Sequence, residues 1–540
     1  MRVDAACAAR PRWAAAVFPP GLDEALAQLR TRVLSRVSSD GAVRGRCDSR
    51  VLETTLLLTL LDRTGGLPER RNALAGYLRS RQHEASPLDR FLIGAALHDG
   101  DRPDTGSLVD DVLASAPSFT TRRKRAMLDA CSAVLGVAQP GQLDPRAFDR
   151  TGLHYWAAVL LTAVKTVLAD GAGQRGLIRD EDVRILLDTQ RPGPVWEGNL
   201  LISIWVLHAL HRLPRTGHTV DAGLRRILGY QRDDGGIPFV ADLDTWTTAL
   251  AGVALTAAGT PPAQLRPLAD YLAARQRPAG GWSATRSASQ TDADTTAVAV
   301  QFLHTVDPSY QDAVEAGCAS LHALCGADGG FPTYLPGAPS ETGMTAAVVD
   351  ALATRWPARE DAIRSGLAFI ATRQAEDGAF PPDWSLSRHY TIFRVLLAAS
   401  RLPGPGTAAT QRMVQRALAL IKRAQNPDGG WGQQPGRPSD PLSTAYALIS
   451  LCQQDDPRAA AQATAYLLHR QRDDGSFTAT PDTVGPRPFT YAVPAQYDIF
   501  VLLALGHLRQ RIQRGTSGSP HPPALTSASS HPGGETSPRY

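Results

Sequence analysis

The sequence predicts an all-α fold built from repeated pairs of helices. A glutamine followed by a glycine-containing turn and an aromatic residue recurs at six places, and a seventh copy has lost the glutamine. The copies begin at residues 190, 231, 276, 325, 374, 425 and 471, which places them 41 to 51 residues apart. A period of this length fits two helices with their turns, and repeats of that kind stack into helical arrays.

Helical stretches flank each of these loops. In the copy at Gln425 they cover residues 417–425 and 443–452, where apolar residues recur at the spacing of a helix with one buried face. Glycine ends the first helix, and the loop then carries the aromatic residue. No strand-like alternation competes with this pattern. The periodicity fits an open solenoid and a closed ring of helix pairs equally well.

Composition sets broad limits on function. The 540 residues are enough for two or three domains, and 43% hydrophobic with 20% charged residues is typical of a globular protein. A net charge of +4 and a single short basic run at 122–125 argue against a nucleic-acid partner. Six cysteines without a CxxC pair, no signal peptide and no apolar run of about 20 residues predict a cytoplasmic protein without a membrane span.

The strongest candidate site is the run Thr291-Asp292-Ala293-Asp294-Thr295-Thr296-Ala297, which precedes an apolar helix. Two carboxylates this close cannot both ionise cheaply, so one of them keeps its proton and can act as an acid. The alternative is structural, because Asp292 or Thr291 is a good cap for the helix that follows.

A similar run one repeat earlier serves as an internal control. Asp242-Leu243-Asp244-Thr245-Trp246 also precedes an apolar helix, so capping alone can produce the pattern. We favour Asp294 as the acid, because only the second run continues as DTTA and because Trp246 would crowd the following position of the first.

These residues resemble a known family. The glutamine-to-aromatic loops resemble the QW motifs of triterpene cyclases, and residues 292–297 resemble the DxDD(T)A signature of class II terpene cyclases. Residues 383–391 and 428–445 look like downstream segments of the same family, and the resemblance covers roughly residues 180 to 505. The fourth motif position is Thr295 instead of aspartate, and a threonine can still hydrogen-bond the acid.

The resemblance implies an α/α double barrel made of a β and a γ domain, with γ inserted after the first helix of β. Residues 1–39 would supply that helix, 40–225 the γ domain, and 226–513 the rest of β with the acid motif. Residues 514–540 are rich in Ser, Pro, Gly and Thr and are expected to form a disordered tail.

The resemblance also implies the chemistry. Asp294 would be the general acid that protonates the terminal alkene of a linear isoprenoid, with Asp292 and Thr295 as its hydrogen-bonding companions. Aromatic side chains would line the cavity and steady the migrating cation. The candidates, each of which is also a plausible packing residue, are Trp384, Tyr390, Trp431, Phe489 and Tyr491.

No DDxxD motif with an NSE-type partner is present, so the sequence shows no machinery for ionising a diphosphate. We therefore expect an isoprenyl diphosphate to be cyclised with its diphosphate retained. The leading prediction is geranylgeranyl diphosphate giving a bicyclic labdane- or halimane-type diphosphate. Farnesyl diphosphate giving drimenyl diphosphate, and a squalene-type triterpene substrate, are the alternatives.

A retained diphosphate needs cations, and the family generally uses Mg²⁺ with basic residues. Arg388, His389 and Arg487 are the first candidates, with solvated surface charge as the alternative for each. The metal ligands are unknown at this stage. Asp180, Glu181 and Asp182 are possible ligands, although acidic residues often simply begin a helix.

Three other classes remain open. A protein prenyltransferase β-subunit needs a zinc site of Asp, Cys and His, for which no cysteine here has a suitable partner motif. A helical glycosidase would use paired carboxylates across a cleft, which leaves the DTTA continuation unexplained. A noncatalytic repeat scaffold would explain the loops and make the aspartate pair incidental. The oligomeric state is left open.

Overall fold

The computed structural model describes residue 13 and residues 17–83, 86–98, 105–114, 120–404, 406–453 and 457–517. The predicted tail lies outside these ranges from residue 518 onward. Helices form nearly all of the regular structure, which confirms the all-α prediction. The strands β1 (Ser49–Arg50) and β2 (Ile237–Pro238) pair antiparallel, with Ser49 opposite Pro238 and Arg50 opposite Ile237.

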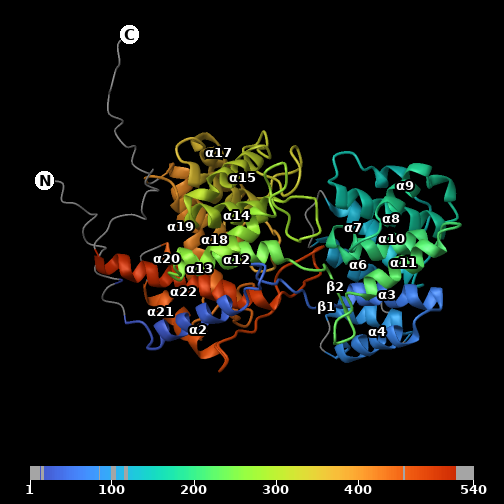
Figure 1. Cartoon of the computed structure of the whole chain (residues 1–540), viewed down its shortest axis with the longest axis horizontal. Helices are drawn as coiled ribbons and strands as arrows, with labels where there is room; N and C mark the ends of the chain where they lie inside the picture. Colours follow the sequence, from blue (N-terminus) through green and yellow to red (C-terminus); the bar gives the residue numbers. More distant parts are fainter. Residues whose placement is uncertain are drawn as a thin grey trace, which may run out of the picture.

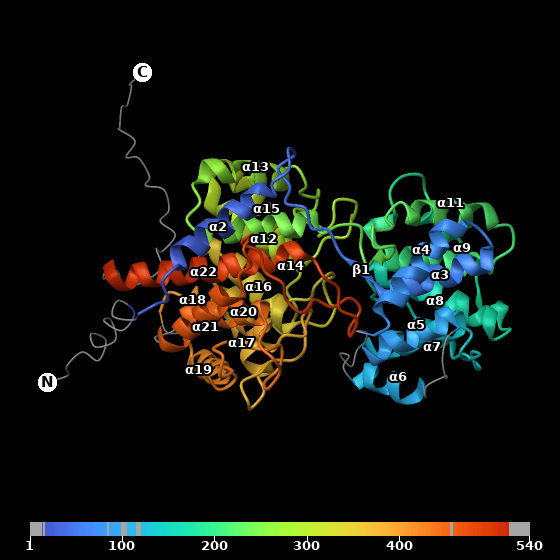
Figure 2. The same ribbon diagram turned by 90° about the horizontal axis from the view of Figure 1, so that it is seen from below.

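The larger of two bodies is a closed ring of helix pairs (Figures 1 and 2). Each inner helix packs against the next, and the last packs against the first, so the ring closes. The inner helices are α12 (Asp244–Ala257), α14 (Ala293–Val306), α16 (Thr342–Leu352), α18 (Arg388–Ser400), α20 (Pro441–Cys452) and α22 (Pro494–Ser517). The outer helices are α13 (Pro262–Ala273), α15 (Gln311–His322), α17 (Glu360–Arg373), α19 (Ala408–Arg423), α21 (Pro457–Arg470) and, at the seam, α2 (Leu22–Ser35).

A second body with its own hydrophobic core is formed by residues between β1 and β2 (Figure 1). In it α3, α7, α8 and α10 pack around one another. Its helices are α3 (Val51–Thr64), α4 (Pro68–Arg81), α5 (Pro87–Leu97), α6 (Thr105–Ala114), α7 (Thr121–Val134), α8 (Tyr155–Gly171), α9 (Asp180–Asp188), α10 (Leu200–Leu210) and α11 (Gly217–Leu228). Short 3₁₀ turns occur at Pro145–Phe148, Arg175–Leu177, Trp196–Gly198, Pro308–Tyr310 and Ala353–Arg355.

The glutamine-to-aromatic loops hold the ring together by repeated hydrogen bonds. The side-chain amide of Gln276 donates to the carbonyls of Gly280 (2.7 Å) and Ala313 (2.8 Å), which closes the turn and ties it to the next outer helix. Gln374 and Gln425 make the same pair of bonds in their own repeats. Gly280 has φ +89°, and a Cβ there would lie 2.3 Å from the carbonyl oxygen of Ala316, so only glycine fits.

The structure contains a further loop of this kind that the sequence pattern missed. Ser38 N–H donates to Ala42 O and Gly41 N–H to Ser38 O, the same pair of bonds that closes the turn at residues 277–281. Gly41 has φ +84°, and Val43 takes the place of the aromatic residue, its N–H donating to Thr248 on α12. The loop lacks both the glutamine and the aromatic, which is why the motif did not reveal it.

This loop explains how the chain passes between the two bodies. Helix α2 and residues 38–43 form the outer half of a repeat whose inner half, α12, arrives some 200 residues later. The second body closes in the same way, because the turn after α11 ends with Ile237 N–H donating to Thr54 on α3. Ile237, and not the predicted Phe239, therefore holds the aromatic position of that repeat. No helix of the described ranges combines the length and the apolar character needed to cross a membrane.

Candidate active site

The inner helices of the ring begin with a shared arrangement that fixes the register of the acid motif. A threonine in the first turn accepts a hydrogen bond from the aromatic residue of the preceding loop, as Thr296 does from Trp282 N–H at 3.0 Å. The residue four positions before that threonine donates its own N–H back to the same loop residue. The pairs are Asp292 with Thr296, Glu341 with Thr345, and Asp440 with Thr444.

Asp292 therefore occupies the N-cap position of its helix, as Glu341 and Asp440 do in theirs, and of these Asp292 and Asp440 cap the helix through the side chain. Its carboxylate accepts from Thr295 N–H at 2.7 Å and from Thr295 Oγ1 at 2.9 Å. Asp440 makes the same two bonds with Ser443 at the start of α20. Burial raises the pKa of Asp292 to about 7, and the charge of Asp294 acts in the same direction. The Asp292 side chain thus caps the helix and has a raised pKa.

Asp294 occupies a position that the other repeats fill differently. In the same register Trp246, Gly343 and Leu442 take its place, so no structural rule of the ring requires an acid there. Its Oδ2 accepts from the indole N–H of Trp246 at 3.0 Å, and its Oδ1 accepts from Arg394 at 2.7 Å. The expected companions are replaced, because Thr295 bonds Asp292. The side chain of Asp294 stays 18% exposed.

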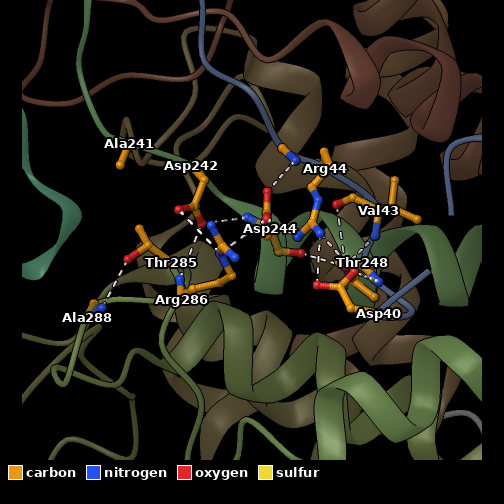
Figure 3. Close-up of polar contacts among 12 residues, drawn as sticks. Asp40, Val43, Arg44, Ala241, Asp242, Asp244, Thr248, Thr285, Arg286 and Ala288 are labelled. Atoms are coloured by element: carbon orange, nitrogen blue, oxygen red, sulfur yellow. Dashed lines mark hydrogen bonds and ion pairs between the residues drawn. The ribbon is translucent and has the colours of Figure 1, made fainter. Parts of the chain in front are cut away.

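The control run at residues 242–246 aligns differently from the prediction. Asp244 lies four residues before Thr248, so it matches Asp292 and not Asp294. Asp244 accepts from Gly45 N–H at 2.9 Å and from Arg44 at 2.7 Å, which ties the segment after the missed loop to α12. Figure 3 shows Arg44 and Asp244 facing each other. Trp246, expected to crowd its own repeat, instead donates to Asp294. The run at residues 242–246 therefore has a structural role, and its Trp246 donates one of the hydrogen bonds to Asp294.

Aromatic side chains gather beside Asp294 at the mouth of the ring. Tyr390 lies 5.3 Å from both Phe393 and Tyr446, measured between ring centroids, and Trp246 lies 6.2 Å from Phe500. Phe500 in turn contacts Tyr446 edge-on at 5.0 Å. The tyrosine and phenylalanine rings are buried, and because the face of an aromatic ring attracts positive charge, the acid lies beside groups that can stabilise a cation.

A cavity of about 440 Å³ lies where the two bodies meet. Its walls come from α7 and α8 of the second body and from the loops that precede α16, α18 and α22 of the ring. The predicted Trp384 and Arg487 both line it. Tyr334 also lines it, stacked on His154 at 4.3 Å, and the charges of Asp292 and Asp294 raise the pKa of Tyr334 beyond the effect of its burial. Neither aspartate of the acid motif lines the cavity, but Ala293 N–H donates to the carbonyl of Thr333, a lining residue, at 2.9 Å.

Three cations line this cavity, Arg123, Lys124 and Arg487, and none of them forms an ion pair with a carboxylate of the described residues. Arg487 donates to the backbone carbonyls of Asp383 and Ser385. Lys124 Nζ donates to the carbonyl of Arg487 at 2.7 Å. Burial and the charges of Arg487 and Arg123 lower the pKa of Lys124 to about 8. Three cations without a carboxylate partner in the described ranges give this part of the cavity a positive charge, which suits an anion.

Two acids, Glu341 and Asp383, also line the cavity. Glu341 accepts from Trp384 Nε1 at 3.0 Å and from Thr333 Oγ1 at 2.5 Å. Asp383 Oδ2 is shielded from solvent, close against Gly343. Burial, together with the charge of Glu341, raises the pKa of Asp383 to about 7. Within the described ranges, no group of three or more His, Cys, Asp or Glu side chains is placed to hold a metal.

Several predicted ligands lie elsewhere. Arg388 is exposed and pairs with Asp377 of a loop at 3.1 Å, so it does not face the cavity. Burial lowers the pKa of His389 to about 4, so it is neutral and gives an anion no positive charge. Trp431 is buried within the ring, its indole donating to Ile421 O at 2.8 Å, as a packing residue.

The remaining candidates are also structural. Phe489 packs in the core of the second body, and Tyr491 packs on Phe239 with ring centroids 5.1 Å apart. Neither lines the large cavity. Asp182, proposed with its two neighbours as a metal ligand, accepts from Lys165 at 2.6 Å and from Arg179 N–H at 2.9 Å. These partners occupy it as the cap of α9.

Arg394, Lys124 and Trp246 are the functional candidates that sequence reasoning missed. Arg394 lies one helical turn after Tyr390 and donates to its hydroxyl at 2.8 Å, so the spacing from a predicted residue was an available signal. Lys124 lies within the basic run that was interpreted as surface charge. Its 9% exposure shows that the run turns one member inward.

Comparison with protein families gives two matches. A model of the squalene-hopene cyclase C-terminal domain matches residues 291–510, and a model of the prenyltransferase alpha-alpha toroid domain matches residues 197–381. The first match begins at the acid motif, and together the two span most of the ring.

Curated relatives extend the similarity to almost the whole chain. A drimenyl diphosphate synthase from Streptantibioticus cattleyicolor is 40% identical over 504 residues, covering 89% of this chain and 93% of that protein. A second, from Streptomyces showdoensis, is 37% identical over 500 residues with the same coverage. Among solved structures, ent-copalyl diphosphate synthase from Streptomyces platensis matches 90% of this chain and 99% of its own, with 18% identity and a TM-score of 0.54, which shows a shared fold.

Proposed function

The chain belongs to the class II terpene cyclases, and on that premise we propose that it cyclises farnesyl diphosphate to drimenyl diphosphate and retains the diphosphate. Two relatives of 40% and 37% identity bear the name of that product, which supports a C15 substrate. Cyclisation of geranylgeranyl diphosphate, the leading expectation from the sequence, remains an untested prediction. The C20 compound therefore becomes the second substrate to test.

The placement of Asp294 is the observation that carries the proposal. Asp294 stands at a position that the other repeats fill with Trp246, Gly343 or Leu442, beside an aromatic cluster and partly exposed. A capping role cannot explain it, because Asp292 already caps the helix. An acid that the fold does not require, next to rings that attract cations, is suited to protonating an alkene.

The chemical step requires little from the protein beyond that acid. The O–H bond of Asp294 breaks and a C–H bond forms with the electrons of the terminal double bond, which leaves a tertiary cation. The next double bonds attack that cation in turn, and loss of a proton ends the reaction. Walls such as Trp384 and Tyr334 fold the chain and exclude water that would quench the cation.

The cations at the other side of the cavity fit the diphosphate end of the substrate. Arg123, Lys124 and Arg487 form no ion pair with a carboxylate among the described residues, and a guanidinium binds phosphate oxygens through two parallel N–H bonds. A diphosphate held there keeps its bond to carbon, since proton transfer to the distant double bond starts the reaction.

Magnesium enters the proposal with the substrate. The described residues give it no protein cage, because no three His, Cys, Asp or Glu side chains among them are grouped to hold a metal. Mg²⁺ usually keeps several waters and binds substrate phosphates directly, so we propose that it arrives as the Mg²⁺–diphosphate complex and offsets the charge of the diphosphate. Activity should then depend on Mg²⁺, while calorimetry on the protein alone should detect no Mg²⁺ binding.

The experiment is a product analysis with both substrates. Purified protein is incubated with Mg²⁺ and farnesyl or geranylgeranyl diphosphate, the products are dephosphorylated, and the alcohols are identified by mass spectrometry. We expect a bicyclic C15 alcohol from farnesyl diphosphate. A cyclic product only from the C20 substrate would overturn the proposed chain length, and linear alcohols from both would overturn the cyclase proposal.

A further inference from the structure

Residues 483–491, which lead into α22, extend from the ring into the second body. They form a hairpin, in which Tyr491 N–H donates to Thr483 O at 2.9 Å and Gly485 N–H donates to Phe489 O at 3.0 Å. Phe489 is 6% exposed and packs in the hydrophobic core of the second body. We call residues 483–491 the bridging hairpin, because they belong to the chain of the ring and are anchored in the other body.

The tip of the bridging hairpin forms part of the cavity wall. Val484, Pro486 and Arg487 line the cavity. The hairpin also contacts a second cation of the cavity, since Lys124 Nζ on α7 donates to the carbonyl of Arg487 at 2.7 Å. The position of the hairpin therefore determines where both of these positive charges lie.

Arg50, at the end of β1, holds the bridging hairpin from the second body. Its Nη1 donates to the carbonyl of Gly485 at 2.6 Å and to that of Phe489 at 3.3 Å. The central carbon of the guanidinium lies 4.4 Å from the ring centroid of Phe239 and 6.0 Å from that of Phe489. Gly485 and Phe489 flank the tip, so one guanidinium fixes both ends of the turn that carries Arg487.

Glu53, in the first turn of α3, fixes the guanidinium in turn. Its Oε2 accepts from Arg50 Nε at 2.7 Å, and its Oε1 accepts from Nη2 of the same guanidinium. Arg50 is 6% exposed and Glu53 is fully buried. A buried ion pair adds little net stability, because both charges lose their water, and apolar side chains of similar volume often serve as well. What this pair adds is a defined geometry between α3 and the hairpin.

We propose that Arg50 is a positioning residue that, held by Glu53, fixes the bridging hairpin so that Arg487 and Lys124 face the diphosphate end of the substrate. The proposal rests on the proposed function, in which these cations bind the diphosphate. Arg50 does not line the cavity, so it acts through the hairpin and not on the substrate. In the chain 435 residues separate it from Gly485, so no local pattern could have indicated the contact.

The second body offers a matched control. Lys165 of α8 forms an ion pair with Asp182 at 2.6 Å, and their side chains are 15% and 2% exposed. Neither residue lines the cavity, and the bonds of Asp182 run to Lys165, Arg150 and the N–H of Arg179. Lys165→Met therefore removes a comparable buried ion pair from the same body without touching the hairpin.

The test measures kcat and KM for farnesyl diphosphate with Mg²⁺, the inhibition constant of inorganic pyrophosphate, and the melting temperature. The variants are Arg50→Lys, the double variant Arg50→Met with Glu53→Gln, and the control Lys165→Met. Lysine keeps the positive charge but lacks the planar fork of donors. The double variant removes both charges together, so no buried charge is left unpaired.

Both Arg50 variants should raise KM and the pyrophosphate inhibition constant by the same factor, because hydrogen bonds that place the cations are lost. We expect about threefold in Arg50→Lys and about tenfold in the double variant. The acid and its aromatic neighbours are unchanged, so kcat should stay within about twofold of wild type. Lys165→Met should lower the melting temperature and leave KM and the inhibition constant as they are.

Unchanged KM and pyrophosphate inhibition in the Arg50 variants would overturn the proposal, as would an equal rise in Lys165→Met or a fall in kcat without a rise in KM. If one of the two Arg50 variants does not fold, the other decides. A wild-type enzyme that cyclises farnesyl diphosphate without inhibition by pyrophosphate would overturn the assignment of the cations, and the proposal with it. A wild type that yields only linear alcohols would instead refute the proposed function, so the failures are separate.

Discussion

The starts of α14 and α20 are built alike, yet only one of them forms a candidate active site. Asp292 and Asp440 both cap their helices, with Thr295 and Ser443 as matching partners, and Thr296 and Thr444 both hold the preceding loop. The difference lies two residues into the motif, where α14 has Asp294 and α20 has Leu442. The repeat supplies a rigid frame at each helix start, and a single inward position is free to carry chemistry.

The largest expected difference between the two sites is catalytic. Asp294→Asn should lower kcat by about 10² to 10⁴, the usual contribution of a general acid, because the amide of asparagine has no acidic proton to transfer to the alkene. Asp440→Asn, the control at the matching helix start, should leave kcat within about twofold of wild type. Steady-state rates with farnesyl diphosphate, combined with melting temperatures, measure both. Equal losses in the two variants would remove the distinction between the sites.

The loops before the two helices also differ, since only one is held by the other body of the protein. Glu197 of the second body accepts from Ser289 N–H at 2.8 Å and Gln290 N–H at 3.1 Å, just before the acid motif. The loop before Asp440 is held from within the ring, by Asn426 donating to Arg437 O and Ser439 Oγ.

Glu197→Ala should therefore misplace the acid and lower kcat/KM by about 10- to 100-fold. Asn426→Ala should lower the melting temperature without a comparable effect on kcat/KM. Kinetics and thermal melts on the two purified variants test the contrast. A Glu197 variant with wild-type kcat/KM would show that the second body does not position the acid motif.

The sequence was sufficient to predict the all-α repeat and to select Asp294, because the loops and the DTTA continuation are local patterns. It placed Asp244 in the wrong register, since DLDTW resembles the acid motif and the true alignment depends on hydrogen bonds from Val43 and Trp282 to threonines on two helices. Arg394 could not be paired with Asp294 from spacing, because 100 residues separate them. Arg388 was chosen for its place in the chain, but the first residue of α18 points outward.

A smaller effect, on KM, is expected where Lys124 of α7 lines the cavity. Helix α20 contributes no residue to that lining, so the comparison of helix starts does not apply there. Lys124 has a pKa lowered to about 8, so it loses its charge as pH rises through 8, and a diphosphate binds best to the charged form. KM for farnesyl diphosphate should therefore rise above about pH 8. Lys124→Met should raise KM about tenfold at pH 7 and abolish that rise. Arg125→Met, an exposed neighbour in the same run, is the control. A pH-independent KM in the wild type would exclude Lys124 from diphosphate binding.

The smallest effect concerns stability, in which the two helix starts should behave alike. Burial raises the pKa of Asp292 to about 7 and that of Asp440 to about 6, above the value near 4 of an unfolded aspartate. The folded state thus holds each proton more tightly, and stability falls as pH rises through those values. Asp292→Asn should flatten the fall in melting temperature between about pH 4 and pH 7, and Asp440→Asn the fall between about pH 4 and pH 6. An unchanged slope in both variants would show that these acids do not titrate as their burial implies.

Incorporation of deuterium from solvent tests most directly whether Asp294 initiates the reaction by protonation. The wild-type enzyme is incubated with Mg²⁺ and farnesyl diphosphate in D₂O, and the dephosphorylated product is examined by mass spectrometry and NMR. Protonation by a solvent-exchanged Asp294 predicts a bicyclic alcohol with one deuterium at the former terminal double bond, and no such product from Asp294→Asn. A cyclic product without deuterium, or one formed at the wild-type rate by Asp294→Asn, would contradict it.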